Sequence, residues 1–273
     1  MDKIKLISRI FLGFISSLLL LALILCIILK LTVFNKSYLL ETIDNSNYYE
    51  LTTEEIQKDM ENSLLSSGLD KSVLNNLVTK ADVKNDVINL VDSIYSGNSF
   101  KLSTDEITEK LNSNIDEFLK KNNITITDKK SLETYTNKIT KVYEDEIGLY
   151  GYLNDYVSKF VKIGNIILIL IPILTLLILI NICIIRFKLD GKYSGVITFS
   201  SALMLIYIKI YILEKIDIQN LLVISKSFSS VIKKVLTDIN DYILFGALIL
   251  IIISLMLNII NSFRKKRRIR KVT

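Results

Sequence analysis

The sequence predicts an all-α integral membrane protein: four transmembrane helices, with an extracytoplasmic helical bundle inserted between helices 1 and 2. Three observations predict this fold class. Half of the 273 residues are hydrophobic and the mean hydropathy is +0.41, which is too apolar for the surface of a soluble domain. The apolar residues gather in four blocks, each close to the roughly 20 residues that cross about 30 Å of hydrocarbon. Between the first two blocks, apolar positions recur at helical spacing.

The first block predicts an uncleaved signal-anchor helix over residues 10–34, after an N-terminus of residues 1–9. A cleaved signal peptide has an apolar core of roughly 7–15 residues, followed by small residues at the cleavage site. Here no charge occurs from residue 10 to residue 29, and no A-x-A pattern follows. The length of the apolar core therefore favours a helix that stays in the membrane.

The other three blocks predict membrane spans at residues 163–185, 196–213 and 242–261. The short segments at alternate ends of the spans are all basic, and the positive-inside rule places such segments in the cytoplasm. On this rule the cytoplasmic segments are residues 1–9, 186–195 and 262–273, and the outer segments are residues 35–160 and 214–241. We therefore expect a multi-pass protein of the plasma membrane with both termini inside.

Seven basic residues and no acidic one follow the last span. They are Arg264, Lys265, Lys266, Arg267, Arg268, Arg270 and Lys271. Because they begin directly after a membrane helix, we expect them to fix its orientation. Contact with anionic lipid headgroups at the cytoplasmic face follows from the same position, at roughly 1 kcal/mol per basic residue. Nucleic acid is not expected as a partner, since no aromatic stacking platform accompanies the run.

The first outer segment predicts a small bundle of four or five helices, which packing alone must hold because the segment contains no cysteine. Thr79 with Asp82, and Ser103 with Glu106, have the form of helix N-terminal caps, and Gly97 stands where a C-cap occurs. The expected apolar stripes are Tyr49, Ile56, Met60 and Leu64; Val73, Leu74 and Leu77; Val83, Val87, Leu90 and Ile94; and Ile107, Leu111, Ile115 and Phe118.

The last helix of this segment, from about Asp128, is predicted to run unbroken into the second span, because no proline occurs before Pro172. Its apolar seam includes Ile139, and Ile147 is expected to replace Glu146 in the seam. The second outer loop predicts an amphipathic helix or helix pair. Docking of this loop onto the bundle is favoured over a position on the outer leaflet.

Charge divides the chain into an acidic and a basic part. From residue 35 to residue 160 there are 14 lysines and 22 acidic residues, a net charge of −8. The remainder holds 20 basic residues (34 − 14) and 6 acidic ones (28 − 22), a net charge of +14. An acidic outer domain is thus expected on a basic membrane unit. The amino-acid usage, rich in Ile, Asn and Lys, favours a low-GC Gram-positive bacterium as the source of the protein.

Residues that usually carry chemistry are scarce. The chain has no histidine, which removes the commonest general base and zinc ligand, and no catalytic, cofactor or metal site is predicted. Ser230 and Lys233 match the S-x-x-K of serine–lysine hydrolases. Neither S-D-N nor K-T-G follows, which favours a polar helix face. Consecutive residues at Glu144, Asp145 and Glu146 fan around a helix, which favours a solvated face over a cation site.

A layer of small and amide side chains is predicted at a similar depth in the inner half of the spans. Its members are Ser16, Ser17, Asn181, Ser200, Ser201 and Asn258, with Ser254 beside Asn258. The expected role is hydrogen bonding between helices, at roughly 1 kcal/mol per bond; a pore or small-molecule path is the alternative.

Lys209, near the outer end of its span, is expected to extend its ammonium group to the interface.

The order of elements resembles that of FtsX-type permease subunits: a short N-terminus, one span, an outer domain and three more spans, with both ends inside. The resemblance implies a membrane subunit of an ABC-type complex, in which a cytosolic ATPase drives the bundle and the outer domain regulates a wall enzyme. It covers topology alone. The short N-terminus leaves no long amphipathic helix before the first span, and the inner loop is a small surface for an ATPase. The chain also resembles four-span membrane proteins of low-GC Gram-positive bacteria.

Together these features favour a non-enzymatic polytopic membrane protein. Its acidic helical outer domain is expected to bind or sense a protein partner in the cell envelope, because nearly all of the non-membrane mass lies outside and no catalytic constellation appears. The alternative is an FtsX-like subunit with a cytosolic ATPase as partner. A small-molecule transporter or membrane enzyme is the third hypothesis, and it requires polar side chains that converge within the membrane helices.

Overall fold

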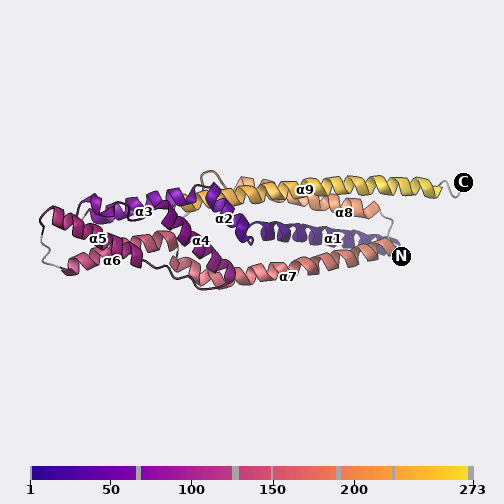
Figure 1. Ribbon diagram of the computed structural model, residues 1–273. Coiled ribbons are helices and arrows are strands. Elements are labelled where there is room, and N and C mark those ends of the chain that lie inside the picture. The colour runs from indigo at the N-terminus through magenta and orange to yellow at the C-terminus, as the bar shows by residue number, and fades with distance from the viewer. Residues whose placement is uncertain are drawn as a thin grey trace. The chain divides into compact units, whose positions relative to one another are not determined.

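A computed structural model describes residues 2–65, 69–124, 129–148, 150–188, 192–222 and 225–269 of the chain. Over these residues the protein is 85% helical and contains no strand, as Figure 1 shows. Four helical stretches are long and apolar enough to cross a membrane: Ile10–Leu31, Lys159–Asn181, Tyr193–Lys215 and Lys226–Phe263. The predicted all-α class with four candidate membrane spans is confirmed.

The chain divides into two compact units. The membrane unit comprises residues 1–35, 164–221 and 232–273, and the helical unit comprises residues 36–163 and 222–231. Two long helices, α7 (Tyr150–Lys188) and α9 (Lys226–Ile269), contribute residues to both units.

The helical unit is built around α3, which packs against α2, η1, α4 and α6. The bounds of its elements are α2 (Lys36–Asn45), α3 (Tyr48–Leu64), the 3-10 helix η1 (Lys71–Leu74), α4 (Lys80–Ser96), α5 (Asp105–Lys121) and α6 (Lys129–Gly148). Most of the predicted apolar stripes are buried here, and Ile56 and Val83 have no exposed surface. Leu74, Ile94 and Phe118 are only half-buried, because each lies at or near the end of its helix.

Two of the three predicted helix caps are confirmed. At the start of α4, the Thr79 hydroxyl accepts from the Asp82 amide while the Asp82 carboxylate accepts from the Thr79 amide at 2.9 Å, a complete capping box. Gly97 ends α4 with φ of 71°. The capping box predicted at Ser103 is wrong. α5 begins one residue later than that motif requires, and the Ser103 hydroxyl instead donates to the Asp105 carboxylate at 3.0 Å.

Replacing Gly97 by alanine is expected to lower the free energy of unfolding of the helical unit by about 1–2 kcal/mol. A Cβ at this position meets only ordinary contacts, 3.6 Å from Val161 Cγ2, so the cost comes from the left-handed backbone conformation. Thermal unfolding followed by circular dichroism measures it. The exposed neighbour Ser96, changed to alanine, should have little effect; equal losses for both variants would contradict the backbone argument.

One predicted helix is not tested by the structure, and another differs from its predicted form. α6 ends at Gly148 and α7 begins at Tyr150, while Leu149 lies outside the described residues, so the unbroken helix predicted there is not tested. α7 itself runs through Pro172 to Lys188 and contains the second candidate span. In the second predicted outer loop there is no separate amphipathic helix from Lys226 onward, because α9 begins at that residue and continues through the fourth candidate span.

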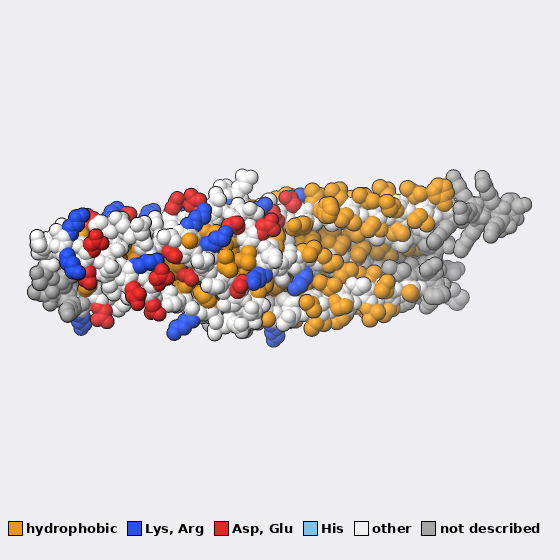
Figure 2. Space-filling view, in the orientation of Figure 1, with side chains coloured by type: hydrophobic (Ala, Val, Ile, Leu, Met, Phe, Trp, Pro, Cys, Tyr) orange, Lys and Arg blue, Asp and Glu red, His pale blue; other side chains and the backbone are white. Residues whose placement is uncertain are grey.

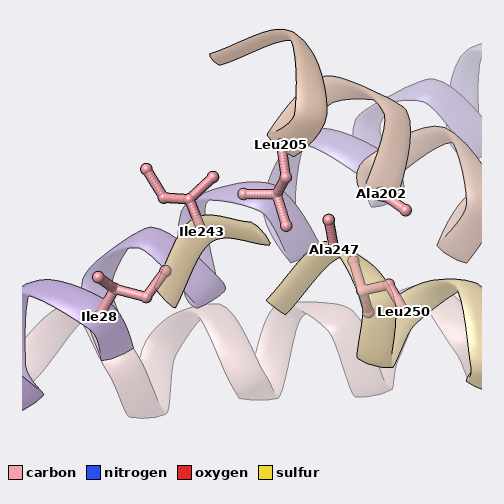
Figure 3. Close-up of a cluster of buried hydrophobic side chains, with 6 residues drawn as sticks. All are labelled: Ile28, Ala202, Leu205, Ile243, Ala247 and Leu250. Atoms are coloured by element: carbon pink, nitrogen blue, oxygen red, sulfur yellow. The ribbon is translucent and has the colours of Figure 1, made fainter. Parts of the chain in front are cut away.

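The membrane unit has a core formed by three of its helices. α1 (Asp2–Leu31) packs against α8 (Lys192–Lys215), and α9 completes the core, as Figure 3 shows. The buried cluster consists of Ile28, Ala202, Leu205, Ile243, Ala247 and Leu250. α7 supplies none of these side chains, although its Ile167 and Leu174 are buried. Large apolar side chains cover the face of this unit seen in Figure 2, as lipid contact requires.

Candidate functional site

The side chains predicted to fix the topology and contact lipid lie outside the part of the chain that the structure describes. The α9 backbone is helical as far as Ile269. The side chains not described include Arg264, Lys265, Lys266, Arg267, Arg268, Arg270 and Lys271. Their contact with anionic headgroups therefore stays a prediction.

Two serines of the predicted polar layer meet between α1 and α8. The Ser201 hydroxyl donates to the Ser17 carbonyl oxygen at 2.9 Å, and the Ser17 hydroxyl donates to the Ile197 carbonyl oxygen at 3.2 Å. Both serines are buried. Because a hydroxyl in hydrocarbon has no water to bond, these reciprocal contacts favour one register of α1 on α8.

α8 and α9 meet at Gly195, a residue that the sequence analysis did not single out. The buried Ser254 hydroxyl donates to the Gly195 carbonyl oxygen at 2.7 Å. The Asn258 side chain lies so close that a Cβ on Gly195 would be 2.8 Å from Asn258 Cγ and 2.9 Å from Nδ2. Glycine thus permits a close approach that a Cβ would allow only if the Asn258 side chain moved. A glycine directly before the predicted span at residues 196–213 was the available sequence signal.

The remaining members of the predicted layer make no described contact with another helix. The Ser16 hydroxyl donates to the Leu12 carbonyl oxygen at 2.9 Å, and Asn181 Nδ2 donates to the Leu177 carbonyl oxygen at 3.1 Å, each within its own helix. Ser200 is half-buried on α8. Ser16 is nevertheless buried, as Ser17 is. The described hydrogen bonds between helices are those of Ser17, Ser201 and Ser254, and a single layer that unites the predicted set stays a prediction.

Lys209 lies near a carboxylate of the membrane unit. Its Nζ is 3.9 Å from Asp241 Oδ1 of α9, and the lysine side chain is largely buried. The predicted outward extension thus has a charged partner on the neighbouring helix. A single pair at this distance contributes little to stability, and its main effect is to compensate the charge of Lys209 on α8.

In the helical unit, a short hydrogen bond between side chains joins α4 to α6. The Tyr143 hydroxyl donates to Asp86 Oδ2 at 2.6 Å, and Tyr143 is fully buried. Burial raises the pKa of Asp86, and the negative charges of Asp82 and Glu106 raise it further. The hydrogen bond from Tyr143 acts in the opposite direction and lowers it. Ile139 was predicted to lie in the apolar seam of this helix, and Tyr143 was not. The i, i+4 series Ile139, Tyr143 and Ile147 was the signal that could have found it.

A second group of carboxylates lies between α3 and α6. Burial raises the pKa of Glu146, and the negative charges of Asp59, Glu55 and Asp145 raise it further. Burial raises the pKa of Tyr48 to about 12, so this neighbouring phenol stays neutral. Of the three consecutive acidic residues in the sequence, Glu144 and Asp145 are exposed and only Glu146 is half-buried.

The carboxylates and Ser230 are the residues left to consider as a metal or catalytic site. Among the described residues, no group of three carboxylate or thiol side chains is arranged to hold a metal ion. The Ser230 hydroxyl donates to the backbone carbonyl oxygens of Ser227 at 2.6 Å and Ser46 at 3.1 Å. Ser230 is therefore used in packing the start of α9, which favours the reading of its S-x-x-K match as a polar helix face.

The helical unit is expected to be more stable at pH 5 than at pH 7.5. Asp86 and Glu146 have raised pKa values in the folded state, so folding favours their protonated forms. This contribution is fully present below the ordinary carboxyl pKa of about 4 and is lost as the pH rises through the raised values. Thermal unfolding in detergent at the two pH values measures it. Asp86→Asn with Glu146→Gln should flatten the pH dependence, whereas Glu109→Gln at an exposed position should not.

The fold and these contacts define a class: an all-helical, multi-pass membrane protein with a separate acidic helical domain. Comparisons of the chain with protein families, with curated proteins and with solved structures found no match. The function must therefore be argued from the residues themselves.

Proposed function

We propose that this chain is a plasma-membrane protein with both termini in the cytoplasm, whose acidic helical domain lies outside and binds or senses a protein partner of the cell envelope. The supporting observation is that the helical unit is compact in its own right and that residues 35–160 carry a net charge of −8. A packed domain with an excess of negative charge attracts partners that carry positive charge. A partner with a basic surface is thus favoured.

Ion pairs within the unit leave this surplus in place. The described pairs are Lys36–Asp92, Lys71–Glu61, Lys80–Glu50, Lys84–Asp44 and Lys110–Glu106. Each pair joins one lysine to one carboxylate, so it removes no net charge. On α5, the exposed Glu109, Asp116 and Glu117 are acidic positions without a described ion pair, and they are the natural place to reduce the charge experimentally.

Affinity purification of the full chain in a gentle detergent, followed by mass spectrometry, tests the proposed function. We expect an envelope protein with a basic surface, recovered less with Glu109→Gln, Asp116→Asn and Glu117→Gln combined. Changing the exposed Lys120 and Lys121 to glutamine is the control and should not lower recovery. A stoichiometric cytosolic ATPase would favour the FtsX-like alternative instead. Recovery that is insensitive to the α5 charges would count against an electrostatic partner surface.

The proposed orientation has its own test. With Cys26 and Cys183 changed to serine, a single cysteine is introduced either by Glu109→Cys or by Lys271→Cys. A membrane-impermeant maleimide should label the first variant in intact cells and the second only after lysis. The reverse pattern would place the acidic domain in the cytoplasm and exclude an envelope partner.

A further inference from the structure

Glu55 makes an N-terminal cap for a helix that begins 171 residues later in the sequence. Its Oε1 accepts from the Lys226 amide at 2.8 Å and from the Ser227 amide at 3.4 Å. These amides belong to the first turn of α9, where backbone N–H groups have no partner within the helix. A carboxylate is the preferred acceptor there, because the N-terminus of a helix carries a partial positive charge.

The same turn has a cap of its own and a second contact with the helical unit. The Ser225 hydroxyl accepts from the Phe228 amide at 3.2 Å, which is the ordinary N-cap geometry. One turn further on, Ser230 Oγ donates to the Ser46 carbonyl oxygen at the end of α2. The start of α9 would therefore form without Glu55. What Glu55 adds is the attachment of that turn to α3.

The attachment also favours Glu55 itself, because other carboxylates lie near it. Glu146 on α6 is close enough to interact with the negative charges of Asp59, Glu55 and Asp145, and the neighbouring Tyr48 is neutral. Glu55 Oε2 is enclosed and has no hydrogen-bond partner among the described residues. The α9 terminus thus supplies the principal favourable contact described for a carboxylate among like charges.

We propose that Glu55 is a latch, which holds residues 225–231 on the helical unit by capping α9 and which releases them when the cap is lost. The latch gives the protein two states that differ at the first turn of α9. Because α9 runs unbroken from this turn to Ile269, the latch acts on the helix that also contains the fourth candidate span. This conformational device does not depend on the proposed partner binding.

Hydrogen–deuterium exchange of the full chain in detergent tests the latch. With Glu55→Ala, the amides of residues 226–228 should exchange about tenfold or more faster, because Lys226 and Ser227 lose hydrogen bonds to a charged acceptor and Phe228 is released with them. Glu55→Gln keeps an acceptor oxygen without the charge and should give a smaller increase. Glu54→Ala is the matched control, because Glu54 is the exposed neighbour on the same helix and its loss changes the net charge equally.

Exchange at Val87 and Leu111, in the buried cores of α4 and α5, reports whether the unit stays folded. Faster exchange at residues 226–228 with unchanged exchange at these two positions supports the latch. Unchanged exchange at 226–228 in Glu55→Ala, or an equal increase in Glu54→Ala, overturns it. If Glu55→Ala unfolds the whole unit, Glu55→Gln replaces it as the test. The latch then requires faster exchange at residues 226–228 without faster exchange at Val87. Unchanged exchange at residues 226–228 in Glu55→Gln rejects the latch.

Discussion

Replacing Tyr143 by alanine is expected to lower the free energy of unfolding of the helical unit by about 3–5 kcal/mol. Deleting a fully buried aromatic ring leaves a cavity between α4 and α6 as well as losing its apolar contacts. It also leaves the half-buried carboxylate of Asp86 without the hydroxyl that donates to it at 2.6 Å. A loss of this size is comparable with the whole stability of many small domains, so we expect the unit to be partly unfolded at 37 °C.

Tyr143→Phe separates the two causes. It keeps the ring and removes the hydroxyl, and it should cost about 1.5–3 kcal/mol, the range for a hydrogen bond to a charged group. Chemical denaturation followed by circular dichroism measures both variants. Leu65→Ala is the control, because Leu65 is 77% exposed. If Tyr143→Ala costs no more than Leu65→Ala, the described packing of α4 against α6 is wrong.

Replacing Gly195 by alanine is expected to destabilise the membrane unit, by about 1–3 kcal/mol as for other overpacked sites. Alanine would by itself favour the helix by about 1 kcal/mol over glycine, but its Cβ would overlap the Asn258 side chain. Gly13 on α1 provides the matched control. A Cβ there meets only Ile197 Cγ1, at 3.8 Å, so Gly13→Ala should be neutral or stabilising. Thermal unfolding in detergent compares the two variants.

A second substitution tests the cause of that loss. Asn258→Ala removes the side chain with which the new Cβ collides, so it should restore most of the stability of Gly195→Ala. On its own, Asn258→Ala should cost less than Gly195→Ala, since the structure describes no hydrogen bond between the Asn258 amide and another helix. A double variant less stable than Gly195→Ala alone would show that the close approach is not the reason.

Part of the candidate site could be read from the sequence, and part could not. The polar residues Ser17, Ser201 and Asn258 were predicted because hydroxyl and amide groups are conspicuous in apolar spans. Their grouping with Ser16, Ser200 and Asn181 in one layer stays a prediction, because depth along a helix can be counted from the sequence but the rotation of each helix cannot. The wrong cap at Ser103 has a similar reason: α5 begins one residue later, and the Ser103 hydroxyl bonds the Asp105 side chain instead.

The sequence by itself determined the helical class, the four apolar helices and the division into an acidic and a basic part. These follow from periodicity, length and charge, which are properties of contiguous residues. Only the tertiary structure decided that Tyr143 meets Asp86, that Asn258 lies against Gly195 and that Glu55 caps α9. Each of these contacts joins residues at least 57 positions apart, and their spacing in the chain carries no information about the packing that brings them together.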